Sequence, residues 1–534
     1  MAVGGDDPQT VAGNVGWSSA AHPAGSVPGD IGVDSTIQPP ANEQAAPSAQ
    51  MPSADDAVDA AKDIERLLSG GLPASRDHAG VAMRARAARH AYDLIRRLPS
   101  RVRQGLASQP NSAADIDPWH RLANASAAFE RKLYPFAQQP SWAAVDMLAG
   151  RGIVMSAGNK DAAYAIIALQ TIRRLGSKTP VELFYCGTQD LSEHNQKLVA
   201  AIPGVRVRNL ADVFNLNTLG AHSYAIKLFA IAASSFEHVM FLDADAFFFK
   251  NPDPLFASPL FTGSGALFFL DRTLPEFFHL GPGMRSMLVD LSPPPGVSKK
   301  AAAGRVARQI SVHEQEAGVL LWDKRRTMHA MLLATLFNSA PYRVHVWDKM
   351  HGEKETFWLA HEALALPYTW FPHAGTAVGY EDKERGVCGS LLHVDVDGTP
   401  LWFNGGLQHN KGEDEGSRQM LEFTHYVTDS LSGTPALSVA DAGTLGREAA
   451  ELPSLGPLLI NATRPGLHAP GAVPPGEMLG TWVFGYHEQP WCLKPRSADW
   501  GEIRPLRAAD KALATWMKWL WASTLPSMSP RPQR

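Results

Sequence analysis

The chain has 534 residues, of which 45% are hydrophobic and 19% are charged, and its formal net charge is −4. This length exceeds what one hydrophobic core usually supports, so two or three units are expected. The absence of a basic excess argues against a nucleic-acid partner. No stretch is long and apolar enough to span a membrane, and the N-terminus lacks the pattern of a signal peptide.

The N-terminal part of the chain divides into two segments of different character. Residues 1–78 are rich in Ala, Gly, Pro, Ser and Asp, so they cannot bury enough apolar surface to offset the entropy of ordering, and we predict a disordered stem. Residues 79–149 carry apolar residues three and four apart and are predicted to be helical. A basic amphipathic helix can lie on a membrane, but packing against the next domain is the preferred interpretation here, because Ala is interspersed among the charges.

From about residue 150 strands and helices alternate. We predict strands over 152–158, 180–187, 205–210 and 238–242, separated by helices over 159–176, 190–204 and 222–236. This alternation predicts an α/β fold with a mostly parallel central sheet, in which ligands bind beyond the carboxyl ends of the strands.

Two aspartates, Asp243 and Asp245, stand at such a strand end. Two carboxylates in that position repel each other unless a cation joins them, and their hard oxygen atoms suit Mg²⁺ or Mn²⁺ that bridges a diphosphate. The Asp-x-Asp patterns at 115–117 and 395–397 lie next to Pro or Gly and are interpreted as turns. A phosphatase of the haloacid dehalogenase type is disfavoured, because Phe247 stands where that class has Thr or Val.

The three cysteines, Cys186, Cys388 and Cys492, form no CxxC or Cys/His cluster, which argues against structural zinc. We expect three buried or inert thiols, and one disulfide with one free thiol is the alternative.

Six stretches in one order resemble the fungal α-1,3-mannosyltransferase family, the type that caps mannan and other glycoprotein glycans. They cover about half of the chain, and they are Gly150–Ser192, Gly220–Phe256, Gly265–Leu274, His313–Lys324, His351–Glu362 and His393–Leu407. One departure from the family pattern is "HGEKE", where "HGDKE" is expected, so that Glu353 reaches one methylene further.

The resemblance implies a GT-A fold, with a catalytic domain over residues 150–430 and a C-terminal extension over 431–534 that packs on it. It also implies GDP-mannose as the donor, Mn²⁺ (or Mg²⁺) as the cofactor and a mannose-containing glycan as the acceptor. The reaction would then be transfer to a mannose hydroxyl with retained α configuration. A Golgi membrane protein with a lumenal catalytic domain is expected as well, although no anchor is visible in this chain.

Donor-side residues follow from the resemblance and from the strand ends. Asp243 and Asp245 would hold the metal, and Asp243 would also touch the nucleotide. Lys227 and Lys411 could reach the diphosphate, and Tyr224 could stack near the nucleotide. The turn after the first strand offers backbone N–H groups of Ala157, Gly158 and Asn159 to the donor.

Sugar-side residues come from two of the other motifs. Glu314, Gln315, Glu353 and Lys354 could orient mannose hydroxyls or stabilise an oxocarbenium-like state. A third metal ligand is expected from His393 or His409, and His393 is preferred because it follows an apolar run. Two other functions remain open at this point: a GT-A transferase that uses a UDP-sugar, and a non-catalytic sugar-binding relative.

Overall fold

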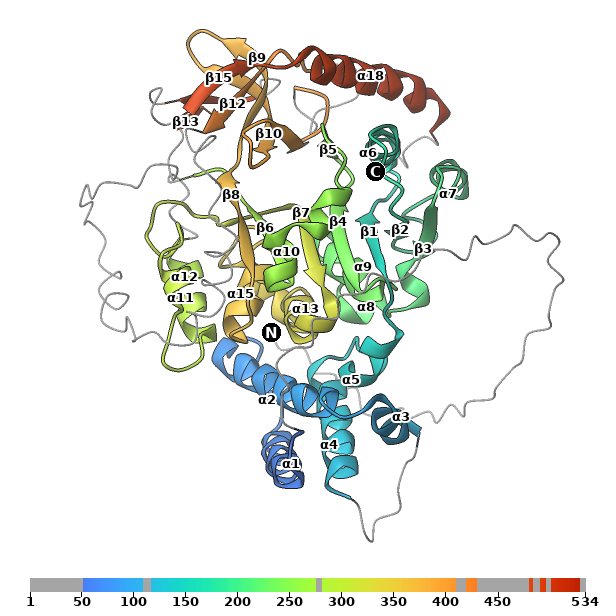
Figure 1. The fold of residues 1–534 in the computed structure, drawn as a ribbon, viewed down its shortest axis with the longest axis vertical. Helices are drawn as coiled ribbons and strands as arrows, with labels where there is room; N and C mark the ends of the chain where they lie inside the picture. Colours follow the sequence, from blue (N-terminus) through green and yellow to red (C-terminus); the bar gives the residue numbers. More distant parts are fainter. Residues whose placement is uncertain are drawn as a thin grey trace, which may run out of the picture. The chain divides into compact units, whose positions relative to one another are not determined.

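A seven-stranded sheet lies at the centre of the part of the chain that the structure describes (Figure 1). The computed structural model describes residues 51–108, 117–274, 281–409, 419–429, 480–483, 490–495 and 501–528. The strand order is β3-β2-β1-β4-β7-β6-β8. These strands are β1 (Arg151–Ser156), β2 (Val181–Tyr185), β3 (Val205–Asn209), β4 (His238–Asp243), β6 (Ala266–Leu270), β7 (Gln315–Asp323) and β8 (Thr369–Ala374).

The predicted α/β fold with a mostly parallel sheet is confirmed. Strands β1 to β4 are mutually parallel, and β6 is parallel to β8, whereas β7 runs antiparallel to both of its neighbours. All nine residues of β7 are buried, because helices or other strands cover both faces of the sheet. The reversed direction of β7 brings its amino end to the edge where β4 and β6 have their carboxyl ends.

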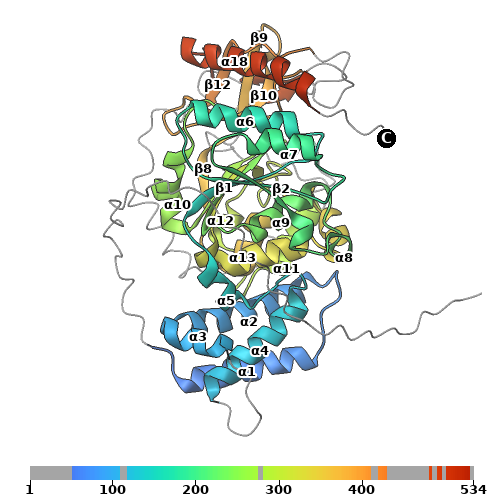
Figure 2. The same ribbon diagram turned by 90° about the vertical axis from the view of Figure 1, so that its right-hand side faces the viewer.

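Alternate side chains of each strand enter two different hydrophobic cores. Val154 and Phe241 point into the core that contains α9 (Ile226–Ala233), α13 (Lys324–Phe337) and α15 (Thr356–Ala363). Met155 and Leu242 point into the core that contains α6 (Ala162–Arg174) and α7 (Glu193–Ala200). Figure 2 shows α6 and α7 on one side of the sheet and α9 and α13 on the other.

The N-terminal helices pack beside α13. They are α1 (Ala54–Ser69), α2 (His78–Arg96), α3 (Ser100–Ser108), α4 (Pro118–Leu133) and α5 (Ser141–Ala144). Two contacts agree with the interpretation of packing: Tyr92 donates to the carbonyl of Arg325 (2.8 Å), and Arg86 donates to the carbonyl of Ala363 (2.9 Å).

Helix α1 lies within the segment predicted to be a disordered stem, so that prediction is wrong for residues 54–69. Ser53 and Asp56 form a capping box at its start. The fully buried Ala57, Ala61 and Ile64 recur at helical spacing. Alanine is therefore a core residue in this helix. The prediction of disorder relied on overall composition, which does not show this role. Residues 1–50 lie outside the described part.

A second, antiparallel sheet follows the central one. Its strand order is β13-β14-β10-β9-β12-β15, and β11 joins β10 to β5. The strands are β5 (Ala246–Phe248), β9 (Thr376–Asp382), β10 (Gly386–Val394), β11 (Pro400–Asn404), β12 (His425–Asp429), β13 (Gly480–Val483), β14 (Trp491–Pro495) and β15 (Gly501–Pro505). Thus β14 and β15 of the C-terminal extension pair with strands of the catalytic region, and β13 pairs with β14.

The expectation of three inert thiols is wrong for two of the cysteines. Cys388 on β10 and Cys492 on β14 stand directly opposite each other and form a disulfide, and Cys186 is a half-buried free thiol. A pairing between residues 104 positions apart depends on strand register, which the cysteine spacing does not reveal.

Further helices complete the described structure. They are α8 (Leu216–Leu219), α10 (Pro259–Ser264), α11 (Gly281–Leu291), α12 (Lys299–Ala302), α14 (Tyr342–Trp347) and α18 (Ala508–Thr524). The last of these lies along α6, where Tyr164 contacts Trp521 with ring centroids 4.4 Å apart. Among the described residues, no helix has the length and apolar character needed to cross a bilayer.

Candidate active site

Three strand ends meet at one edge of the central sheet and bring most of the predicted site residues together. Asp243 is the last residue of β4 and pairs with Ser156 of β1. Asp245 lies in the short turn between β4 and β5, which then pairs with β11 of the second sheet. The aspartates therefore stand where the chain passes from one sheet to the other.

Lys227 on α9 connects Asp243 to a second carboxylate. Its ammonium nitrogen lies 3.1 Å from Oδ1 of Asp243 and 2.8 Å from Oε1 of Glu353, and it donates to the carbonyl of Ala317 at 2.9 Å. Lys227 and Glu353 are each 6% exposed, whereas Asp243 is 28% exposed. Burial alone would lower the pKa of Lys227, but the two carboxylates raise it above its ordinary value, so the ammonium stays charged.

The carboxylates around Asp243 outnumber the cations that face it. Burial, with Asp245, Glu353 and Glu316, raises the pKa of Asp243 to about 7, although Lys227 acts in the opposite direction. Burial is the main cause of this raised pKa, and the neighbouring carboxylates add to it. Hard oxygen atoms in such surroundings fit a divalent cation, so Asp243 and Asp245 fit the metal that the family resemblance implies.

Lys354 pairs with a residue that the sequence analysis did not select. Its ammonium group lies 2.7 Å from Oδ2 of Asp271, which directly follows β6 and is 2% exposed. Burial opposes the ionisation of Asp271, but Lys354 and Arg272 hold the pKa of its carboxyl below the ordinary value. A signal was present in the sequence, because Asp271 ends an apolar strand just as Asp243 does.

Glu314 and Gln315, the two residues predicted from "HEQEAG", differ in their hydrogen bonding. Both carboxylate oxygens of Glu314 are engaged: Oε1 accepts from the backbone of Val306 (2.6 Å) and Oε2 from Arg305 (3.3 Å). Gln315 is fully buried, and neither polar atom of its side chain has a hydrogen-bond partner among the described residues. Buried polar groups are usually paired, so Gln315 stands out as a side chain with unused hydrogen-bonding capacity.

Glu316 and Asn404 extend this group, and the sequence analysis did not select them either. Asn404 on β11 donates to Oε1 of Glu316 at 2.7 Å, and its own side-chain oxygen has no partner. Burial and the proximity of Asp271 raise the pKa of Glu316. Asn404 comes from another sheet and lies 88 positions away in sequence, so no local pattern points to it.

The turn after β1 is closely packed. An added Cβ at Gly158 would lie 2.2 Å from Oδ1 of Asp190, so only glycine fits there. Asn159 donates its backbone N–H to the carbonyl of Asp190 (2.7 Å), and its side-chain oxygen accepts from Ser192 and Asn195. The oxygen of Asn159 thus holds the start of α7, and Ala157 continues the β1 ladder toward Phe184.

Tyr224 lies on the short 3-10 turn Ser223–Ala225 that precedes α9. Its side chain is 59% exposed, and its ring lies beside Gly352, next to Glu353. An exposed aromatic face near the Lys227 pair agrees with a stacking role. Lys411, the other predicted contact with the diphosphate, lies outside the described residues.

His393 does not join the aspartates in a metal-binding group. Its ring stacks on Trp402, with centroids 4.2 Å apart, both nitrogens lack partners, and burial lowers its pKa to about 3. Among the described residues, the group whose ligand atoms all lie within 4.8 Å is Glu237, His238 and Asp323, at the opposite end of β4. The alternative, His409, stacks on Tyr380. A third ligand therefore remains a prediction.

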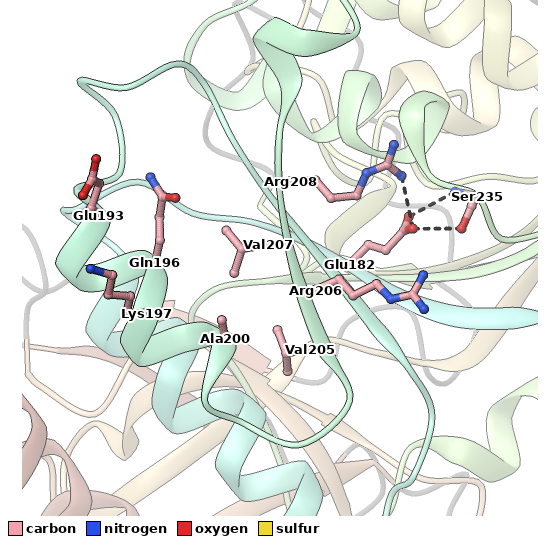
Figure 3. Close-up of a pocket in the computed structure, with 10 residues that line it drawn as sticks. All are labelled: Glu182, Glu193, Gln196, Lys197, Ala200, Val205, Arg206, Val207, Arg208 and Ser235. Atoms are coloured by element: carbon pink, nitrogen blue, oxygen red, sulfur yellow. Dashed lines mark hydrogen bonds and ion pairs between the residues drawn. The ribbon is translucent and has the colours of Figure 1, made fainter. Parts of the chain in front are cut away.

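A surface hollow of ≈ 960 Å³ lies elsewhere, between β3 and α7 (Figure 3). Glu182 on its wall accepts hydrogen bonds from Arg208 (3.1 Å) and Ser235 (2.8 Å). None of the predicted site residues lines this hollow.

The comparisons with known proteins find one family model, described as "Mannosyltransferase putative", which matches residues 150–395. Two similar proteins of Saccharomyces cerevisiae are "Probable alpha-1,3-mannosyltransferase MNT4" (25% identical, covering 48% of this chain and 50% of the relative) and "Alpha-1,3-mannosyltransferase MNT2" (24%, covering 48% and 52%). A third is "Alpha-1,2-mannosyltransferase MNN23" of Candida albicans (25%, covering 44% and 45%). The chain thus spans about half the length of the curated relatives it matches.

Among solved structures, the mannosyltransferase Ktr4p of S. cerevisiae is 11% identical with a TM-score of 0.30, covering 45% of this chain and 72% of that one. Core-mannan synthase A of Aspergillus fumigatus in its Mn/GDP form is 11% identical with a TM-score of 0.29, covering 43% and 75%. The family match and the curated relatives agree with the resemblance drawn from the six motifs: residues 150–395 are similar to the fungal mannosyltransferase family.

Proposed function

We propose that this chain transfers mannose from GDP-mannose to a mannose hydroxyl of a glycoprotein glycan, in an α-1,3 linkage with retained configuration and with Mn²⁺ or Mg²⁺. The observation that carries the proposal is the Lys227–Asp243–Glu353 arrangement beside Asp245, at the carboxyl edge of the central sheet and within the residues that match the family model. The relatives include both α-1,3 and α-1,2 enzymes. They therefore support mannosyl transfer more directly than they support the α-1,3 linkage.

The residues of the chain would divide the work between them. Asp243 and Asp245 would hold the divalent cation, which when bound neutralises charge on the leaving diphosphate. Lys227 is already charged, so it can interact with that diphosphate without a proton transfer. Gln315 has a free amide for sugar hydroxyls, whereas Glu314 supports the edge through Arg305. Gly158, Tyr224 and Lys411 remain candidates for nucleotide contacts, whereas the backbone N–H groups of Ala157 and Asn159 already donate to Phe184 and Asp190.

The disulfide favours an oxidising compartment, since such bonds are rare in reducing ones. This agrees with the proposal of a lumenal Golgi enzyme.

The experiment offers the purified chain GDP-mannose, UDP-glucose or UDP-galactose with mannobiose, in Mn²⁺ and then in excess chelator. We expect mannose transfer that chelation abolishes. Asp245→Asn should lower it roughly a hundredfold or more, because several kcal/mol of charge stabilisation depend on the cation. The matched control is Asp397→Asn, which alters another Asp-x-Asp pattern at a residue that is 58% exposed.

Transfer from a UDP-sugar alone would overturn the donor. Nucleotide binding without turnover on any donor would favour the non-catalytic relative. Full activity of Asp245→Asn would show that the aspartate pair is not needed for transfer. The linkage is determined from the structure of the product.

A further inference from the structure

Arg272 lies over two indole rings that come from the C-terminal extension. Its guanidinium carbon is 4.5 Å from the ring centroid of Trp491 and 5.3 Å from that of Trp482. The side chain is 23% exposed, and it directly follows Asp271 at the end of β6. Two aromatic faces around one guanidinium restrict its position and favour its charge.

The hairpin that carries these rings is held firmly to the second sheet. β13 pairs with β14, and β14 pairs with β10, where the Cys388–Cys492 disulfide joins the two strands next to Trp491. Trp482 and Leu493 also share a small apolar cluster with Leu274, two residues after Arg272. The hairpin therefore forms a fixed wall beside residues 271–274.

Arg272 connects this wall to the site through Asp271. The backbone N–H of Arg272 donates to Oδ1 of Asp271 at 2.7 Å, and its Nε lies 3.6 Å from the same oxygen. The other oxygen of Asp271 accepts from Lys354 at 2.7 Å. Lys354 directly follows Glu353, which shares Lys227 with Asp243.

We propose that Arg272 is a positioning residue for the transfer reaction, and that Trp482 and Trp491 fix it so that Asp271 and the Glu353–Lys354 segment keep their places beside the aspartate pair. This rests on the proposed function. The hairpin lies outside the family match at residues 150–395, so the C-terminal extension contributes to the site although the family pattern does not include it.

The test compares Trp491→Ala with Trp491→Phe, which keeps an aromatic face. The matched control is Trp516→Ala, which removes an indole from another cation–π pair of the extension, with Arg174 at the end of α6 (4.7 Å). We measure kcat, both KM values, Mn²⁺–GDP affinity and hydrogen exchange of the amides of residues 271–274. A positioning role predicts a roughly tenfold fall in kcat for Trp491→Ala, equivalent to about 1.4 kcal/mol in the barrier, with Mn²⁺–GDP affinity kept.

The expected result includes faster amide exchange at residues 271–274 in Trp491→Ala, recovery in Trp491→Phe, and no such change in Trp516→Ala. Equal kcat and equal exchange in Trp491→Ala and wild type would overturn the proposal. If Trp491→Ala fails to fold, the variants Trp491→Phe and Arg272→Lys replace it in the test. A kcat that is unchanged in both of them would overturn the positioning role of Arg272. If the wild-type chain transfers no mannose, the proposed function is wrong. Hydrogen exchange at residues 271–274 then tests separately whether Trp491 holds Arg272 in place.

Discussion

The ammonium group of Lys227 is shared by two carboxylates from distant parts of the chain, Asp243 on β4 and Glu353 before α15. The longer side chain of Glu353, where the family pattern expects Asp, reaches Lys227 at 2.8 Å. Two acids and one base leave the group with an excess of negative charge. A divalent cation beside these carboxylates would offset that excess.

Replacing Lys227 tests this arrangement through stability. Lys227→Ala leaves two largely buried carboxylates without their shared cation, so we expect the free energy of unfolding to fall by about 3 kcal/mol. The measurement is urea unfolding at pH 7. Lys250→Ala is the matched control, because Lys250 also joins two carboxylates, Asp395 and Asp397, but at a more exposed place (25% exposed), and it should cost about 1 kcal/mol or less. Equal losses in the two variants would contradict the prediction.

At the scale of elements, the sequence predicted β1 to β4 and the helices between them because each carries its own hydrophobic period. Contacts between remote segments were not predictable in this way. β5 pairs with β11 about 150 residues later, and that pairing decides which residues surround Asp245. Asn404 was missed for the same reason, whereas Asp271 was overlooked although it directly follows an apolar strand. Asp243, Lys227 and Glu353 were found because motifs mark them.

The disulfide supports a second prediction at this scale. The double variant Cys388→Ala/Cys492→Ala removes a link between residues 104 positions apart, and we expect the free energy of unfolding to fall by about 2–5 kcal/mol. Urea unfolding measures the change, and Cys186→Ala, which alters the free thiol, should change it by less than about 1 kcal/mol. An unchanged midpoint in the double variant would mean that β10 and β14 stay together without the bond.

Over the whole molecule, buried histidines tie stability to pH. Burial lowers the pKa of His329, His361 and His393 to about 3 each, against an ordinary value near 6.5. Between these values the unfolded chain binds more protons than the folded one. The contribution of these residues is therefore complete above about pH 6.5 and is lost as the pH falls toward 3.

We accordingly expect the free energy of unfolding to decline as the pH drops from 7 to 4, and His361→Gln to flatten that decline. Urea unfolding at several pH values measures both. The control is His120→Gln, at a side chain that is 25% exposed on α4. A decline that keeps its full slope in His361→Gln would exclude this histidine as a cause.

The boundary of the family match is not a boundary of the folded molecule. The segment of residues 150–395 contributes to one compact unit with the other described residues beyond residue 50. Helices α2 and α4 cover the apolar side of α13, and α18 covers part of α6. A fragment limited to residues 150–395 would lack these covering helices, so apolar faces of α13 and α6, on the two sides of the sheet, would be exposed to water. Expression of this protein should therefore include the N-terminal helices and α18.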